Sequence, residues 1–104
     1  MIIARWHIDA RFGQKPAVIA ALKSWNGDIA SQIGWTKDNM RIASGAIGAL
    51  ESTLEVDVLV KDLASLNTAW DKLATIPAHK EWSKLLEPLI VSGTPRWEVL
   101  RVVD

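Results

Sequence analysis

The segment LESTLEVDVLV, residues 50–60, constrains the fold more than any other part of the chain. Apolar and polar residues alternate along it, and successive side chains of a β-strand point to opposite faces. One face would carry Leu50, Leu54, Val56, Val58 and Val60, together with Ser52. The other face would carry Glu51, Thr53, Glu55 and Asp57, together with Leu59. The segment therefore predicts a strand with a hydrophobic core against one face only.

Three more segments have strand character, at residues 2–10, about 38–44 and 96–103. The first helical region runs from Pro16 to about Gly34, and its apolar stripe consists of Val18, Leu22, Trp25, Ile29 and Ile33. The second begins after the candidate N-cap Asp62, and its stripe consists of Leu63, Leu66, Trp70 and Leu73. Pro77 interrupts this helix, and a further helical turn or two follows it.

The order β-α-β-β-α-β predicts a ferredoxin-like α+β fold, with a four-stranded antiparallel sheet and helices on one face. We expect one such domain over residues 1–104.

The 12 basic and 12 acidic residues balance without a basic cluster, so no nucleic-acid partner is expected. The absence of cysteine excludes disulfides and thiolate chemistry. No apolar run reaches the roughly 20 residues that cross a bilayer, and no leader-like segment precedes the first strand. A cytoplasmic protein without a membrane partner is expected.

Strand alternation separates the adjacent residues Trp6 and His7. Trp6 is predicted to face the helices with Val56 and Val58, where it would pack in the core. His7 is predicted on the open face of the sheet. The other residues expected there are Ile3, Arg5, Asp9, Glu51, Thr53, Glu55, Asp57, Leu59, Leu100 and Val102. Ile3, Leu59, Leu100 and Val102 would leave a sizeable apolar area on this face, which favours a partner that covers it. A second copy of the same sheet is the simplest partner. The alternative is a solvated face with a few apolar residues.

The segments GAIGALESTLEVDVLVKDLASLNTAWDKL and HKEWSKLLEPLIVSGTPRWEVLRV resemble the dimeric α/β-barrel superfamily. Within it the chain is most similar to NIPSNAP-like and antibiotic-biosynthesis-monooxygenase-like small proteins, over almost its whole length. The resemblance implies a homodimer with two sheets face to face, and a pocket between sheet and helices in each subunit. Some members are cofactor-independent oxygenases acting on polycyclic or quinol substrates. Another branch degrades haem with an Asn on the first strand and with a Trp and a His around the second helix. Here that strand offers His7 and no Asn, and Trp70 and His79 match the remaining two positions loosely.

His7 is the first candidate for chemistry, as a general base oriented by a carboxylate of the face that carries Asp57 and Glu55. The alternative is that His7 belongs to a structural ion-pair network. Candidate ligand-binding residues are Arg5, Glu55, His79 and Trp82, with His79 and Trp82 near the mouth of the pocket. The helical position of His79 favours a half-exposed residue without a role over one that closes a pocket. Trp6, Trp25 and Trp70 could line a cavity for an aromatic ligand, but their spacing favours core packing. No metal site is expected, because the two histidines lie far apart in the sequence.

These observations lead to a homodimer that binds a small apolar or aromatic molecule near the open face, without a cofactor. It could act on that molecule as a cofactor-independent monooxygenase or related enzyme. The first alternative is a non-enzymatic dimeric interaction protein with no pocket. The second is haem binding. The sequence leaves open whether the chain is an enzyme, because it contains no motif that proves one.

Overall fold

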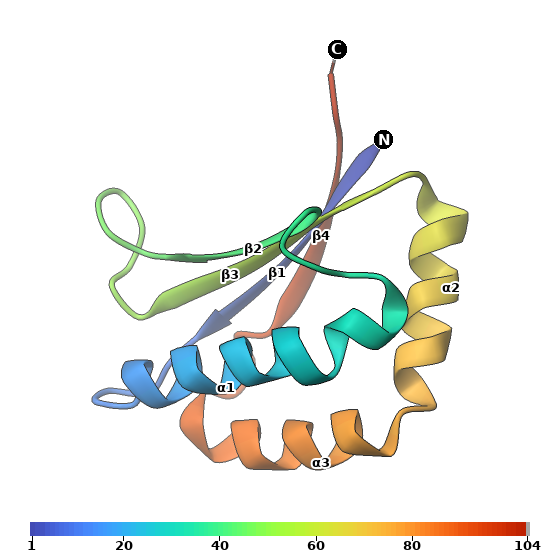
Figure 1. Cartoon of the computed structure of the whole chain (residues 1–104). Helices are drawn as coiled ribbons and strands as arrows, with labels where there is room; N and C mark the ends of the chain where they lie inside the picture. The colour runs from blue at the N-terminus through green and yellow to red at the C-terminus, as the bar shows by residue number, and fades with distance from the viewer. Residues whose placement is uncertain (104) are drawn as a thin grey trace.

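The computed structural model describes residues 1–103 and contains one antiparallel sheet with the strand order β2-β3-β1-β4 (Figure 1). Its strands are β1 (Ile2–Asp9), β2 (Met40–Ser44), β3 (Thr53–Val60) and β4 (Arg96–Arg101). Its helices are α1 (Lys15–Asp28), α2 (Leu63–Ala74) and α3 (Pro77–Leu86), with short 3-10 turns η1 (Ala30–Ile33) and η2 (Glu87–Leu89). The predicted ferredoxin-like α+β fold is confirmed, and the second helical region is two helices.

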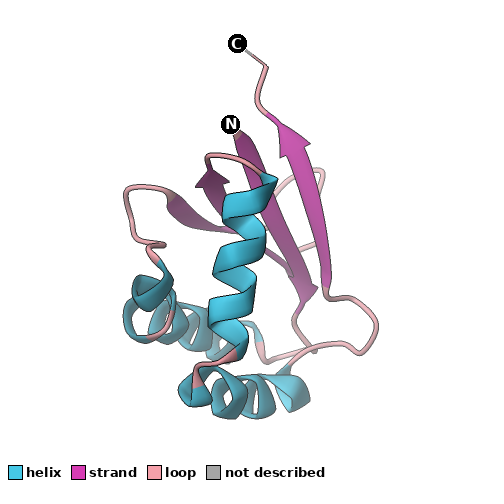
Figure 2. Ribbon diagram, turned by 90° about the vertical axis from the view of Figure 1, so that its right-hand side faces the viewer, coloured by secondary structure: helices cyan, strands magenta, loops and turns pink. Residues whose placement is uncertain are grey.

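The helices lie on one side of the sheet and leave its other side open (Figure 2). The strand register places Trp6 beside Val56 on the covered face and His7 beside Glu55 on the open face. The largest fully buried side chains lie between the sheet and the helices: Ile8, Leu22, Leu54, Leu66, Val18 and Val58. The predicted opposition of Trp6 and His7 is therefore confirmed. Among the described residues, no helix has the length and apolar character needed to cross a membrane.

The third strand begins later than predicted, at Thr53, and Leu50 is 67% exposed instead of facing the core. Glu51 likewise precedes the strand and has no place in its polar face. The cause is a tight return of the chain, in which the Thr53 amide donates to the Leu50 carbonyl and the Gly45 amide donates to the Thr53 carbonyl. A Cβ at Gly45 would lie 1.8 Å from the Leu50 carbonyl oxygen. Only glycine permits this approach.

The first helical region is regular to Asp28 and then tightens into η1 before Gly34. Gly34 has a φ of 80°, and its amide and that of Trp35 donate back to Ser31 and Ala30. This left-handed ending satisfies carbonyls that a continuing helix would use. The predicted single helix to Gly34 is thus wrong in its last turns.

The second helical region starts and breaks where the sequence predicts. The Asp62 side chain accepts a hydrogen bond from the Ser65 amide, with N and O 2.8 Å apart, and this bond lowers the pKa of Asp62. Pro77 begins α3 as its first residue. The predicted stripe of α2 needs one correction, since Leu63 is 58% exposed at the start of the helix and Ala69 is buried instead.

Candidate functional site: an aromatic cavity

All six tryptophans of the chain form one continuous cluster on the helix side of the sheet. Trp6 and Trp97 are cross-strand partners on β1 and β4, with ring centroids 6.3 Å apart. Trp70 of α2 meets Trp97 edge-on at 5.3 Å. Trp25 of α1 contacts Trp82 of α3 at 5.7 Å and Trp35 at 6.2 Å. The helices and the sheet thus meet through aromatic rings, which favour such tilted and edge-on contacts.

A cavity of about 330 Å³ lies within this cluster. Its walls come from the helix side of the sheet and from all three helices: Trp6, Trp25, Val56, Trp70, Leu73, His79, Trp82, Ser83, Leu86, Glu87, Ile90 and Trp97. The lining is mainly aromatic and aliphatic, with a few polar groups, which is typical of small-molecule sites. The predicted core tryptophans Trp6, Trp25 and Trp70 therefore pack and line the cavity at once.

His79 is the only histidine among the lining residues, and its ring is held by two tryptophans. The Trp25 Nε1–H donates to His79 Nδ1 over 3.0 Å. The Trp82 ring stacks on the imidazole, with centroids 5.9 Å apart and an interplanar angle of 22°. Trp82 is anchored in turn, because its Nε1–H donates to the Ala21 carbonyl over 2.8 Å. Burial lowers the pKa of His79 below its ordinary value, which favours the neutral ring.

Trp70 contributes a buried indole N–H without a hydrogen-bond acceptor among residues 1–103. A buried donor without a partner costs about 1–3 kcal/mol. The edge-on contact with Trp97 compensates part of that cost through favourable ring geometry.

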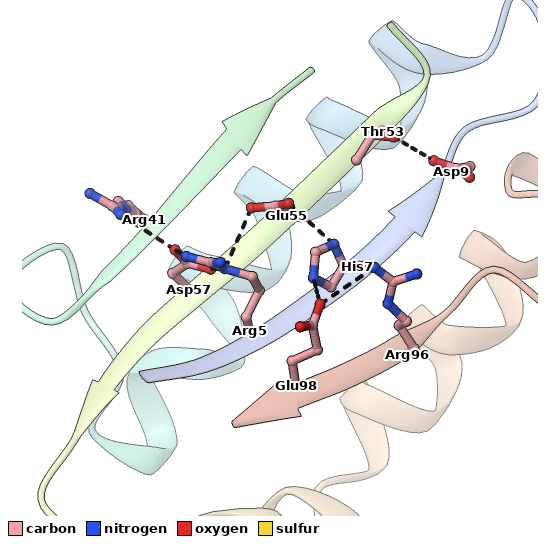
Figure 3. Close-up of polar contacts among 9 residues, drawn as sticks. All are labelled: Arg5, His7, Asp9, Arg41, Thr53, Glu55, Asp57, Arg96 and Glu98. Carbon is pink, nitrogen blue, oxygen red and sulfur yellow. Dashed lines mark hydrogen bonds and ion pairs between the residues drawn. The ribbon is translucent and has the colours of Figure 1, made fainter. Parts of the chain in front are cut away.

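The open face carries a row of acidic and basic side chains, with His7 among them, that crosses all four strands and is called the charged row below (Figure 3). In order across the sheet the row consists of Arg41, Asp57, Arg5, Glu55, His7, Glu98 and Arg96. Arg5 binds Asp57 with two hydrogen bonds of 2.9 and 3.1 Å. Arg41 Nη2 lies 3.4 Å from Asp57 Oδ2. Opposite charges on neighbouring strands thus compensate each other within one chain.

His7 lies between two carboxylates in this row. Its Nδ1 is 3.2 Å from Glu55 Oε1, and its Nε2 is in close contact with Glu98 Oε1, without the alignment of a hydrogen bond. Asp57 does not orient His7, because it is committed to Arg5 and Arg41. Burial alone would raise the pKa of Asp57, but the bonds and charges of Arg5 and Arg41 outweigh it and keep that pKa below the usual value. This arrangement favours the structural alternative for His7.

The structure divides the six predicted site residues between two faces. Arg5, His7, Glu55 and Asp57 come together on the open face. His79 and Trp82 lie on the opposite side of the sheet and line the aromatic cavity. They cannot border one pocket with the first four residues, because the sheet separates them. Trp97 of the cavity wall and Glu98 of the open face are site residues that the sequence does not single out.

A second hollow, of about 310 Å³, lies at the edge of the open face beside β2. Of the predicted residues only Asp57 lines it, and the remaining lining residues are Ile3, Lys37, Asp38, Asn39, Met40, Arg41, Val58 and Leu59. Lys37, Asp38 and Arg41 are exposed side chains that can move. The aromatic cavity is framed by three helices and the sheet, so it is the better candidate site. Among residues 1–103, no three His, Asp or Glu side chains are grouped to hold a metal ion.

Solved structures with the same fold cover nearly the whole chain. A NIPSNAP family protein from Agrobacterium tumefaciens has a TM-score of 0.82 at 18% identity, over 99% of this chain and 93% of its own. A NIPSNAP domain protein from Burkholderia xenovorans has a TM-score of 0.78 at 11% identity, over 100% and 96%. A candidate antibiotic biosynthesis monooxygenase from Deinococcus radiodurans has 0.67 at 10%, over 100% and 94%. No family model matches the chain, and no curated protein matches its sequence. The likeness confirms the fold that the resemblance implied.

Proposed function

We propose that this chain binds a flat, largely apolar or aromatic small molecule in the cavity on the helix side of the sheet. The observation that carries the proposal is the cavity of about 330 Å³ with five tryptophans in its wall. Aromatic rings offer stacking and edge contacts to a flat ligand, and burial of apolar ligand surface supplies most of the binding energy. The proposed site lies on the helix side of the sheet, and Trp82 and His79 form part of its wall.

The experiment compares the same substitution at two positions of β3. Val56 lines the cavity, whereas Val60 faces the same side of the sheet and is not among the lining residues. Val56→Phe places a ring in the space that the ligand needs. Calorimetric titration with naphthalene as the probe should show binding to the wild type and to Val60→Phe. Val56→Phe should bind at least about tenfold more weakly, a loss of about 1.4 kcal/mol. Equal affinity of both variants would contradict the proposed site.

The second candidate is that the protein oxidises the bound molecule without a cofactor. Two solved structures with this fold, from Deinococcus radiodurans and Nitrosomonas europaea, are named as candidate antibiotic biosynthesis monooxygenases, which favours this chemistry. The substrate itself would then supply the electrons: an activated CH2 group and O2 would give a carbonyl group and water. Oxygen uptake with anthrone, above the rate of the Val56→Phe variant, tests this candidate. No excess over that variant means that the cavity binds without oxidation.

We also propose that a second copy of the chain covers the open face. Apolar side chains beside the charged row support this, because Leu59 is 41% exposed and Leu100 is 37% exposed. Ile3 pairs with both of them across the sheet, so the three residues form one patch, the Ile3 patch. The acidic and basic side chains of the charged row pair within one chain. A partner that covers this face would therefore bury no unpaired charge of the row. A cytoplasmic location fits such a cysteine-free dimer.

The remaining alternatives find less support in the geometry. An interaction protein without a pocket does not account for the aromatic cavity. Haem is a larger ligand than the cavity favours, because about 330 Å³ suits two or three fused rings better than a tetrapyrrole. A haem titration without a Soret band would remove that alternative.

A further inference from the structure

His79 has one nitrogen that is already committed. The Trp25 Nε1–H donates to Nδ1 over 3.0 Å, so Nδ1 acts as an acceptor. A neutral imidazole has one acceptor nitrogen and one N–H donor. The proton of neutral His79 must therefore be on Nε2, and the hydrogen bond from Trp25 selects this tautomer.

The ring has little freedom to exchange its two nitrogens. Trp82 stacks on one side of it, and Trp25 meets it at an interplanar angle of 60°. Trp82 is itself tied to the Ala21 carbonyl of α1, so the packing of α1 on α3 sets the position of the imidazole. A ring flip would break the bond to Trp25 and leave the indole N–H without its acceptor, which costs about 1–3 kcal/mol.

The Nε2–H of His79 is not used by any described residue of the chain. Among residues 1–103 it has no hydrogen-bond partner, and it is not one of the buried polar atoms, in contrast to the Trp70 indole nitrogen. The other polar side chains of the wall are Ser83 and Glu87. Ser83 already donates its hydroxyl hydrogen to the His79 carbonyl over 3.0 Å. His79 therefore offers a neutral donor in a wall of otherwise mainly aromatic and aliphatic groups.

We propose that Trp25 fixes His79 as the Nε2–H tautomer and that this N–H donates to an acceptor atom of the bound ligand. The ligand class is then a flat aromatic molecule that carries a carbonyl or another uncharged acceptor. This inference deepens the proposed function and rests on it for the ligand. Trp25 is a positioning residue. His79 in this state is a hydrogen-bond donor and is not free to act as a general base at Nε2.

The tautomer is tested first, in the free protein. Nitrogen-15 NMR distinguishes a protonated from an unprotonated imidazole nitrogen, and the chain has only two histidines. His7→Gln identifies the signals of His79. We expect Nδ1 to be unprotonated and Nε2 to be protonated in the wild type and in Trp35→Phe. Trp25→Phe keeps a ring but removes the donor, so a mixture of tautomers should appear. A mixture in the wild type, or an unchanged spectrum in Trp25→Phe, would overturn the assignment.

The donor role is tested with two ligands of nearly equal shape. 2-Acetylnaphthalene has a carbonyl acceptor, and 2-isopropenylnaphthalene has a CH2 group in its place. The ratio of their dissociation constants is compared between the wild type and His79→Leu, which cancels their different hydrophobicity. Wild type should favour the ketone by about two- to tenfold more than His79→Leu does.

The outcomes separate this inference from the proposed function. An equal ratio in both proteins, with both ligands bound, overturns the donor role and leaves the binding site in place. No binding of either ligand overturns the proposed function and the donor role together, whatever tautomer the NMR spectrum shows. A stability measurement on His79→Leu confirms that the folded variant is the species titrated.

Discussion

Asp57 shows how its neighbours decide what a buried carboxylate can do. It is only 7% exposed, and burial opposes its charge. Two hydrogen bonds from Arg5 and a contact with Arg41 outweigh this effect and keep its pKa low. A carboxylate that is held in its ionised form is a poor proton acceptor. Asp57 therefore stabilises the open face, and the chemistry of the molecule is expected on its other side.

Asp57→Asn should lower the free energy of unfolding by about 2 kcal/mol at pH 7. This is less than the 3–5 kcal/mol of a fully buried pair, because Arg5 is partly solvated. The folded pKa of Asp57 lies below its unfolded value, so its contribution is present above about pH 4 and is lost as the pH falls through the folded pKa. Urea unfolding from pH 7 to pH 3 should show the two proteins converging. The exposed Asp71→Asn variant is the control, and a difference that stays constant with pH would contradict the explanation.

His79 should make stability depend on pH in a higher pH range than Asp57 does, because partial burial of its ring favours the neutral form. The same burial lowers the folded pKa of His79 below its ordinary value. The unfolded chain therefore binds more protons between the two pKa values, and stability rises with pH in that range. Wild type should lose stability relative to His79→Gln as the pH is lowered from 7.5 to about 5. Any contribution of His7 to the pH dependence is the same in both proteins, so it cancels in the difference between their free energies of unfolding. Parallel stability curves would show that His79 does not titrate in this way.

At the scale of residues, strand alternation predicts the face of each side chain but not its partner. The positions of Trp6 and His7 alone predict that they lie on opposite faces, and the strand register confirms it. The partners depend on register between distant strands, which local sequence does not encode. For that reason the pattern does not predict that His7 meets Glu98 of β4, or that Asp57 meets Arg5 instead of His7.

At the scale of elements, the turn before β3 shows why a regular pattern can overextend a predicted strand. The alternation in residues 50–60 continues unbroken, yet the strand starts at Thr53. Two backbone hydrogen bonds around Gly45 and Leu50 bend the chain before that point. Alternation reports which residues could share a face, whereas the close approach of Gly45 to Leu50 arises from tertiary structure. Capping and proline signals are local, and both Asp62 and Pro77 act as predicted.

Gly45→Ala should destabilise the protein by about 2 kcal/mol or more, because the new Cβ would lie 1.8 Å from the backbone oxygen of Leu50. Backbone atoms cannot yield as a flexible side chain can. Gly27→Ala is the matched control, since a Cβ there meets nothing within 4 Å inside α1. It should stabilise the protein by about 0.5–1 kcal/mol through helix propensity. Thermal and urea unfolding measure both changes, and similar effects of the two variants would refute the role of Gly45.

At the scale of the whole molecule, the fold was predictable because each element has one apolar side. Two one-sided helical regions and a one-sided strand can bury these surfaces together only on one face of a sheet. The aromatic cavity was not predictable in this way, because its tryptophans come from the sheet and from all three helices. Helical and strand spacing assigns Trp25 and Trp6 to the core, and it cannot show that their packing leaves a space.

The proposed dimer contact can be tested by substitution in the Ile3 patch of the open face. A two-fold contact places each substituted side chain in the interface twice, so one change introduces two unpaired charges. Leu59→Arg should therefore weaken association by at least about 100-fold, or about 2.7 kcal/mol. Leu63→Arg is the control, because Leu63 is also exposed but lies at the start of α2. Light scattering after size-exclusion chromatography should give twice the chain mass of 11.5 kDa for the wild type and the control, and a lower mass for Leu59→Arg. A monomeric wild type, or a dimeric Leu59→Arg variant at low micromolar concentration, would place the interface elsewhere or remove it.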